Sequence, residues 1–406
     1  MVALQALSVA VGAVLVLAIL GSALKTVVLP QEGFPRLAQA VFAVVHRVLV
    51  HHSRSRERAI ALRSLYAPVA LVSLPLVWML FMVVAFTLIF WGTGSMSWQR
   101  AFEISGSSLT TLGFSEPSGT ARIWLAIIEA TIGLGLVALL ISYLPTIYGA
   151  YNGREKGIVR LRPISGAPPD VVTLLLTLQR VGALDNLEFW RNQSEWVIDI
   201  EQTHTAFPIL TYFPETHRDH SWVAAIGTLL DAAALVLAAS ETEQDEAFAD
   251  MEKGPMMVLV YGMPAFVRVA RAASIRIGEP MLIAEITGHF SEPPPPIAVT
   301  RAEYDDAMAA LAPIISVAPD RREDGWRRFA WIRSSYEPAV RSLAGLTFAY
   351  PAPWTTDRPA LVGRPRFLRR RYIEVDWTVP VRASDEMEPT GPAAPAPESP
   401  ASPTGG

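Results

Sequence analysis

The sequence contains no cysteine among its 406 residues. Disulfide bonds, thiolate metal sites and cysteine nucleophiles are therefore excluded. Its formal net charge of −4 leaves no excess of positive charge, which argues against a protein that binds nucleic acid. No Gly-x-Gly-x-x-Gly motif follows a predicted strand, so the sequence offers no nucleotide site of the doubly wound type.

Charge is also missing from three long stretches, while 51% of all residues are hydrophobic. No charged residue lies in 1–24 or in 66–99, and Glu129 is the only one in 123–152. About 20 helical residues cross a hydrocarbon core of about 30 Å. We therefore expect three transmembrane helices. They are the segments Leu4–Leu24, Pro68–Trp91 and Ile123–Tyr148.

The first of these segments has two interpretations. It has the position of a secretory signal, and a cleavage site after Gly21-Ser22-Ala23 is conceivable. However, it lacks a basic region before the apolar run, and the run is long for a signal. We expect an uncleaved helix within an N-terminal segment at 1–30.

Basic residues predict the orientation in the membrane, because loops rich in Lys and Arg stay in the cytoplasm. The segment between the first two expected helices and the segment after the third are basic, whereas the loop between the second and third is balanced. The basic residues are Lys25, Arg36, Arg47, Arg54, Arg56, Arg58, Arg63, Arg154, Lys156, Arg160 and Arg162. This predicts an N-terminus and a 92–122 loop outside, and a cytoplasmic C-terminal region. The Ala-, Arg- and Pro-rich composition is typical of a bacterial protein, so we expect the bacterial inner membrane.

The loop between the second and third expected helices is the most informative part of the sequence. Residues 97–109 have the length of a short helix, and two threonines, a glycine and an acidic residue follow in 110–116. Non-helical backbone at membrane depth is tolerated only where protein or a water-filled cavity surrounds it. The order of residues predicts a short helix at 97–109 and a re-entrant loop at 110–116.

The run Thr111-Leu112-Gly113-Phe114-Ser115-Glu116 resembles the selectivity filter of potassium channels, which reads Thr-Val-Gly-Tyr-Gly-Asp or close to it. The resemblance covers about residues 65 to 150. Ser115 departs from it, because the family has a second glycine there. The resemblance implies a pore domain at 65–152 in a homotetramer. Its parts would be an outer helix at 68–91, a pore helix at 97–109, a filter at 110–116 and an inner helix at 123–148.

The resemblance also implies how the loop would work. Backbone carbonyl oxygens would replace the water around a permeant K⁺ ion, and Glu116 would lie at the outer mouth. Gly113 suits the backbone angles that this needs, while its two neighbours would point away from the axis and brace the loop. The implied ion-binding residues are Thr111, Leu112, Gly113, Phe114 and Ser115. Passive transport implies no enzymatic activity and no cofactor.

Three residues of the third expected helix are candidates for a gating hinge, namely Gly133, Gly135 and Pro145. Close packing by small residues is the alternative for the glycines, and both remain open. For Glu129 we expect a structural hydrogen bond behind the filter rather than an ion site. No helix with periodic arginines precedes the pore segment, so no voltage sensor is expected.

The remaining sequence predicts a basic, amphipathic cytoplasmic segment at 31–64, a helical cytoplasmic domain at 153–383 and a disordered Pro/Ala-rich tail at 384–406. The domain resembles C-terminal extensions of uncharacterised bacterial two-helix channel proteins. The resemblance lies in Trp196, Glu201-x-x-His204-Thr205, and Ser221-Trp222 leading into Leu230-Asp231-Ala232-Ala233. The resemblance supplies no activity, and an unknown ligand is expected to bind there. The segment 221–240 is apolar enough for a fourth span. We expect it to be a core helix, because Asp231 lies at its centre.

One group of residues has metal-ligand spacing. Glu201 and His204 are three residues apart, as are His217 and His220, with Glu215 and Asp219 nearby. We expect helix capping and surface hydrogen bonding here rather than a metal site.

Three functions remain open from the sequence. The first is a cation channel, either potassium-selective or non-selective. The second is a membrane sensor or scaffold whose pore segment no longer conducts. The third is a membrane-tethered enzyme that works through the His/Glu group.

Overall fold

The computed structural model describes residues 2–27, 36–51, 65–94, 96–215, 219, 221–240, 246–273, 275, 277, 293–315, 319–347 and 349–358. Regular structure within these ranges is helical and includes no β-strand. The mainly α fold is thus confirmed for the described residues. The tail predicted at 384–406 lies outside them, as do residues 31–35 and 52–64 of the basic segment predicted at 31–64.

Among the residues that the structure describes, four helices are long and apolar enough to cross a membrane, which points to a membrane protein. They are α1 (Val2–Val27), α4 (Tyr66–Gly92), α6 (Thr120–Ser165) and α9 (Trp222–Ser240). The first three contain the three expected spans. A further helix, α2 (Arg36–His51), packs against α4.

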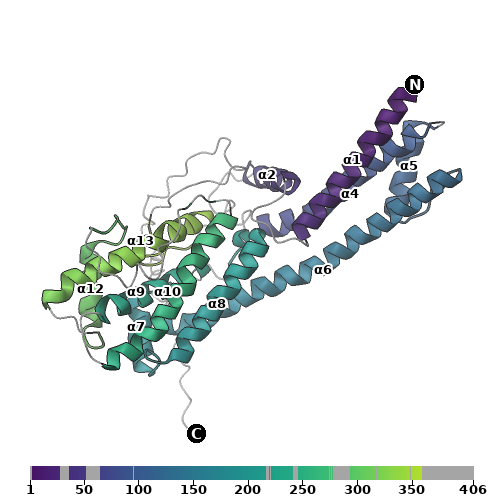
Figure 1. Ribbon diagram of the computed structural model, residues 1–406. Helices are drawn as coiled ribbons and strands as arrows, with labels where there is room; N and C mark the ends of the chain where they lie inside the picture. The colour runs from purple at the N-terminus through teal and green to yellow at the C-terminus, as the bar shows by residue number, and fades with distance from the viewer. Residues whose placement is uncertain are drawn as a thin grey trace, which may run out of the picture. The chain divides into compact units, whose positions relative to one another are not determined.

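Helices α1 and α4 lie side by side along most of their length (Figure 1). Small residues allow this close approach. A Cβ atom at Gly12 would collide with the backbone oxygen of Ala85, and the Ser8 hydroxyl donates to the Leu88 carbonyl at 2.7 Å. The backbones of the two helices therefore come into close contact near Gly12 and Ala85.

The short helix α5 (Trp98–Leu109) packs between α4 and α6. It begins at Ser97, whose hydroxyl accepts a hydrogen bond from the Arg100 amide at 3.2 Å, as expected for an N-cap. Its buried face includes Ala101, Ile104 and Ser105. The predicted short helix at 97–109 is therefore present, one residue shorter at its start.

Helix α6 is much longer than expected, because it continues from the predicted 123–148 to Ser165. The domain border drawn after residue 152 thus falls inside one continuous helix. Gly153 does not break it, and the neighbouring Arg154 and Gly157 are buried against later parts of the chain. Contacts to α7 (Val171–Arg180), α8 (Leu187–Ala206) and α9 hold this extension in place.

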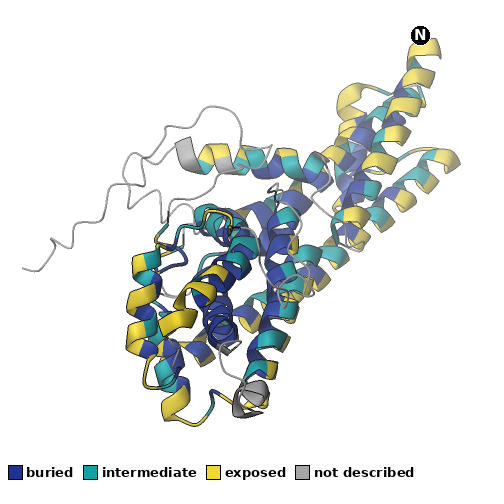
Figure 2. Cartoon of the chain, turned by 60° about the vertical axis from the view of Figure 1, so that its left-hand side comes forward, coloured by how far each residue is buried: buried dark blue, intermediate teal, exposed yellow. Residues whose placement is uncertain are grey.

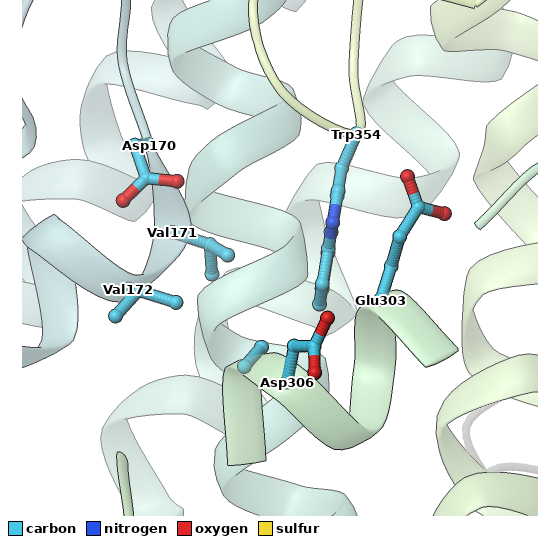
Figure 3. Close-up of a pocket in the computed structure, with 7 residues that line it drawn as sticks. Asp170, Val171, Val172, Glu303, Asp306 and Trp354 are labelled. Carbon is cyan, nitrogen blue, oxygen red and sulfur yellow. The ribbon is translucent and has the colours of Figure 1, made fainter. Parts of the chain in front are cut away.

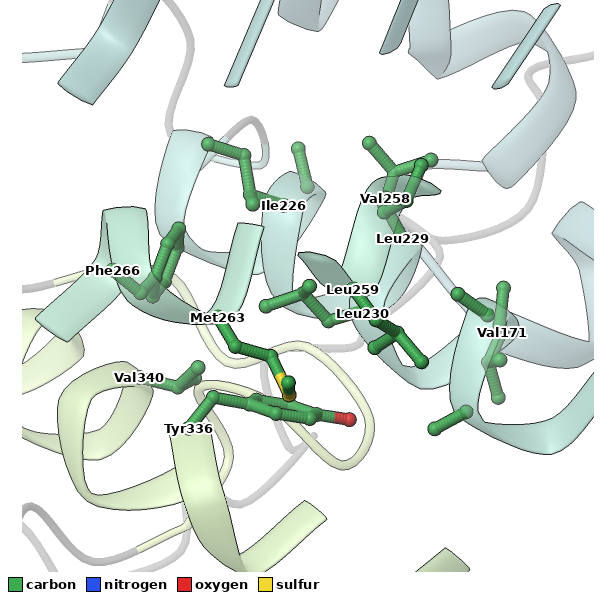
Figure 4. Close-up of a cluster of buried hydrophobic side chains, with 14 of the residues drawn as sticks. Val171, Ile226, Leu229, Leu230, Val258, Leu259, Met263, Phe266, Tyr336 and Val340 are labelled. Carbon is green, nitrogen blue, oxygen red and sulfur yellow. The ribbon is translucent and has the colours of Figure 1, made fainter. Parts of the chain in front are cut away.

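The described residues after α6 form a helical bundle with one large apolar core. It contains α7 (Val171–Arg180), α8 (Leu187–Ala206), α9, α10 (Glu246–Ala272), α12 (Arg301–Leu311) and α13 (Arg322–Thr347), with the 3₁₀ turns η1 (Pro208–Tyr212) and η2 (Pro319–Arg321). Figure 4 shows Leu230 of α9, Met263 of α10 and Tyr336 of α13 meeting in this core.

Helix α9 is surrounded by α6, α7, α10 and α13, and its apolar stretch is buried throughout. Figure 2 shows the contrast with α6, which keeps exposed residues along much of its length. Asp231 in the centre of α9 pairs with the buried Arg333 and accepts from the Tyr336 hydroxyl at 2.7 Å. Protein thus covers this helix, as expected for a core helix.

Replacing Asp231 by alanine should lower the free energy of unfolding by about 3 kcal/mol, because the Arg333 guanidinium would stay buried with one carboxylate fewer. Chemical unfolding in detergent, followed by circular dichroism, measures this loss. Asp305→Ala is the matched control. Its carboxylate pairs with Arg301 at the surface, and its removal should cost less than about 1 kcal/mol. Equal losses would contradict a stabilising role for the buried pair.

Candidate functional site

The loop after α5 turns sharply and is bound to the last turn of that helix. The Thr111 amide donates to Ser108 O at 3.0 Å, and the amides of Leu112 and Gly113 donate to Ser107 O at 3.1 and 3.4 Å. Such bonds satisfy carbonyl groups that a helix end leaves open. In contrast, the carbonyl oxygens of residues 110–115 accept no hydrogen bond from the described part of the chain.

Two residues of the loop have backbone angles in the left-handed region. Gly113 has φ of 69°, which a glycine adopts at little cost and which agrees with the role expected for it. Thr111 has φ of 57°, which costs a non-glycine residue roughly 1 kcal/mol. Ser115, which stands where the resembled family has its second glycine, is not among the residues with positive φ. The strained position is Thr111.

The side chains of the loop differ in burial. Leu112 and Phe114 are 71% and 66% exposed, so the described residues of the chain leave largely uncovered the two residues expected to brace the loop. Ser115 is only 5% exposed, and its amide donates to the Ser107 hydroxyl at 3.0 Å. Glu116 is exposed, and its backbone oxygen accepts from the Arg100 guanidinium at 3.3 Å.

The three hinge candidates lie within α6, which runs without interruption through them. Gly133 faces α5 so closely that a Cβ atom would collide with the backbone oxygen of Leu109. Gly135 meets open space, and Pro145 is exposed. Of the two roles considered for the glycines, close packing therefore describes Gly133.

The hydrogen bond expected at Glu129 is present. This residue is fully buried in α6, and its Oε1 lies 2.5 Å from the Ser105 hydroxyl of α5. Glu129 and Gly133 are one helical turn apart, so the same face of α6 contacts α5 at both positions.

The residues with metal-ligand spacing do not come together in the described structure. The Glu201 carboxylate forms an ion pair with Arg268 instead. The His204 ring is fully buried against Trp222, with ring centroids 5.0 Å apart, and its Nδ1 lies 2.9 Å from Ile200 O. His217 and His220 lie outside the described residues. No group of three potential ligands occurs in the described ranges.

Burial also sets the protonation of this region. It lowers the pKa of His204 to about 3, and the nearby positive charge of Arg154 adds to the effect. His204 is therefore a neutral core histidine whose Nδ1 donates to the Ile200 carbonyl. Burial raises the pKa of Glu215 to about 7, although the Ser221 hydroxyl and Arg154 oppose this.

Arg154 is a residue whose role the sequence did not reveal. Its buried guanidinium lies 3.1 Å from Leu210 O and 3.2 Å from Pro214 O, and it also pairs with Glu155. It thus binds one carbonyl group within η1 and one shortly after it, and it connects that turn to α6. In the sequence Arg154 is one of several basic residues that follow an apolar helix, which is typical of a membrane-flanking charge, so no local signal indicated this role.

A hollow of about 290 Å³ lies between the starts of α7 and α12 (Figure 3). Its acidic side chains are largely engaged in helix ends. Asp170 accepts from the Thr173 amide at 2.7 Å, and Glu303 completes a capping box with Thr300. The hollow is therefore the space between the starts of two neighbouring helices, and we assign no function to it.

Gly133→Ala should destabilise the protein by roughly 1–3 kcal/mol, because α5 would have to move away from α6. Gly135→Ala is the matched control on the same helix. It has open space and should be neutral or stabilise by up to about 1 kcal/mol. Thermal unfolding in detergent distinguishes the two. A similar effect of both substitutions would contradict the close approach of α5 and α6 at Gly133.

His204 should make stability depend on pH below its ordinary pKa of 6.5. Between this value and about 3, the unfolded chain binds a proton that the folded protein does not bind. The free energy of unfolding should therefore fall as pH drops through this range, by up to roughly 1.4 kcal/mol per unit from this residue. His204→Gln should flatten that dependence. An unchanged slope in pH-dependent unfolding would contradict a neutral, buried imidazole.

Similarity to known proteins offers no further guide. No family model, curated protein or solved structure matches this chain. A function has to be inferred from the residues themselves and from their geometry.

Proposed function

We propose that this chain is a subunit of a cation channel in which four copies surround one pore, with K⁺ as the expected permeant ion. The observation that carries the proposal is the loop at 110–115, whose amides are largely bound to α5 while its carbonyl oxygens accept no hydrogen bond in the described chain. Carbonyl oxygens of this kind can replace the hydration shell of a cation.

The position of α5 supports the same proposal. This short helix lies between two long apolar helices and ends at the loop. The C-terminal end of a helix carries partial negative charge, which favours a cation nearby. One chain supplies one such loop, and a ring of oxygens around an ion needs several.

The exposed Leu112 and Phe114 fit an assembly of several copies. Within the described part of one chain, these large apolar side chains are largely exposed, although they belong to the loop to which the proposal assigns ion binding. In the proposed tetramer, neighbouring copies would cover them and hold the loop in shape. The described single chain would then be an incomplete site.

In this proposal the chain lies in the bacterial inner membrane with its N-terminus and the pore loop outside. The distribution of lysine and arginine supports this orientation. The C-terminal domain would lie in the cytoplasm and influence opening, through an unidentified ligand. Contacts of η1 with α4 and of Arg154 with η1 give it a direct connection to the pore helices.

Purified protein should have a tetrameric mass in detergent and should carry current in planar bilayers. Under opposed K⁺ and Na⁺ gradients, we expect a reversal potential close to that of K⁺. Equal permeability would identify a non-selective cation channel. A monomeric mass without current would overturn the proposal, and a tetramer without current would favour the non-conducting sensor or scaffold.

Gly113→Ala should reduce the current by at least about tenfold, because an alanine at φ of 69° costs roughly 1 kcal/mol or more and shifts the loop backbone. Gly119→Ala is the matched control. Gly119 also has positive φ and open space around it, but it lies beyond the loop at the start of α6. Loss of current in both variants, or in neither, would argue against ion binding by residues 110–115.

A further inference from the structure

At the buried contact between α4, α5 and α6, the hydroxyl of Ser105 is close to two other oxygen atoms, but it has only one proton to donate. The Ser105 hydroxyl oxygen lies 3.0 Å from Val83 O of α4 and 2.5 Å from Glu129 Oε1 of α6. Two oxygen atoms at 2.5 Å need a proton between them. Ser105 has one proton to give, and a carbonyl oxygen has none.

Counting protons therefore decides the state of the acid. If Ser105 donates to the Val83 carbonyl, the proton in the shorter contact must come from Glu129. The Thr87 hydroxyl also donates to Val83 O at 2.7 Å, but its proton lies in that separate contact. In that case the shortest contact in the group is a carboxylic acid that donates to a serine hydroxyl.

Burial supports the same assignment independently. Glu129 is fully buried, and its second oxygen, Oε2, has no hydrogen-bond partner. An ionised carboxylate in an apolar helix layer needs a cation or several donors, and it has neither of these from the described residues. A neutral acid needs only one acceptor for its proton, which Ser105 provides.

We propose that Glu129 is held in its protonated form and acts as a positioning residue for the loop at 110–116. It donates to Ser105, which donates to Val83, so one chain of hydrogen bonds joins α6, α5 and α4. The effect on conduction rests on the proposed channel function, whereas the protonation does not.

The connection from this chain to the loop is short. Two residues after Ser105, Ser107 holds the loop with both of its oxygen atoms. Its carbonyl accepts from Leu112 and Gly113, and its hydroxyl accepts from Ser115. A displacement of α5 at Ser105 therefore moves the acceptors on which the loop geometry depends.

A spectroscopic test addresses the proton directly. Infrared spectra of wild-type protein and Glu129→Gln in lipid at neutral pH should differ by the carbonyl stretch of one protonated carboxylic acid, present only in the wild type. The proposal would be overturned if the wild-type spectrum lacked this band and the substitution removed a band of an ionised carboxylate instead. This readout does not require a current.

A functional test addresses positioning. Glu129→Gln keeps a donor for Ser105 and should retain the current within about twofold, whereas Glu129→Leu removes the donor and should reduce it about tenfold. Ser105→Ala should resemble Glu129→Leu. Ser73→Ala, the same change on a partly exposed residue of α4 whose hydroxyl donates to Val69 O of the same helix, is the matched control and should resemble the wild type.

The outcomes separate the two proposals. If the wild type conducts and Glu129→Leu and Ser105→Ala both conduct equally well, Glu129 is not a positioning residue. If Glu129→Leu fails to fold, Ser105→Ala and the infrared band still decide. If the wild type carries no current, the channel proposal fails, while the infrared band continues to test the protonated acid.

Discussion

Backbone amides that leave a helix within an apolar layer need hydrogen-bond partners, and the last turn of α5 supplies them to the loop that follows. Ser107 is central to this, because its carbonyl and its hydroxyl together bind three amides of the loop. The geometry of the loop is therefore fixed by the position of α5. That position is fixed by α4 and α6, through the buried Ser105 and the close approach at Gly133.

Helix α6 connects this region with the C-terminal bundle. Its first half packs on α5, and its second half carries Arg154, which binds one carbonyl group within η1 and one shortly after it. The same turn reaches α4, where Tyr212 meets Tyr66 edge to face with ring centroids 5.6 Å apart. In the proposed channel, η1 would contact both the outer and the inner helix and would transmit a change in the bundle to either of them.

The sequence predicted the helices better than it predicted their ends. The expected spans at 4–24 and 68–91 lie within α1 and α4, because charge-free runs of that length have few alternatives. The end of α6 was missed by 17 residues, from 148 to Ser165, since the polar residues after Asn152 are as compatible with helix as with a linker. Their helical state depends on partners far away in the sequence, such as Trp196 against Gly157.

The candidate site was also only partly predictable, because some of its features follow from local sequence and others depend on distant contacts. Gly113 stood out, because a glycine between larger residues marks unusual backbone angles, and the structure gives it a positive φ. Thr111 did not stand out, because a threonine ordinarily avoids the left-handed region. Its positive φ accompanies the hydrogen bond from its amide to the last turn of α5, which the sequence does not show. Likewise, the sequence led us to expect helix capping and surface hydrogen bonding at His204, whereas its ring is fully buried against Trp222.

The sequence by itself determined that this chain is mainly helical, that it carries long apolar helices, and that a short helix and a glycine-containing loop lie between two of them. These features follow from local composition and periodicity. The tertiary structure decided that Glu129 meets Ser105, that Gly133 is a contact rather than an open position, and that Arg154 holds η1. The physical reason is that hydrogen-bond partners and burial are shared between segments far apart in the sequence, so no single segment specifies them.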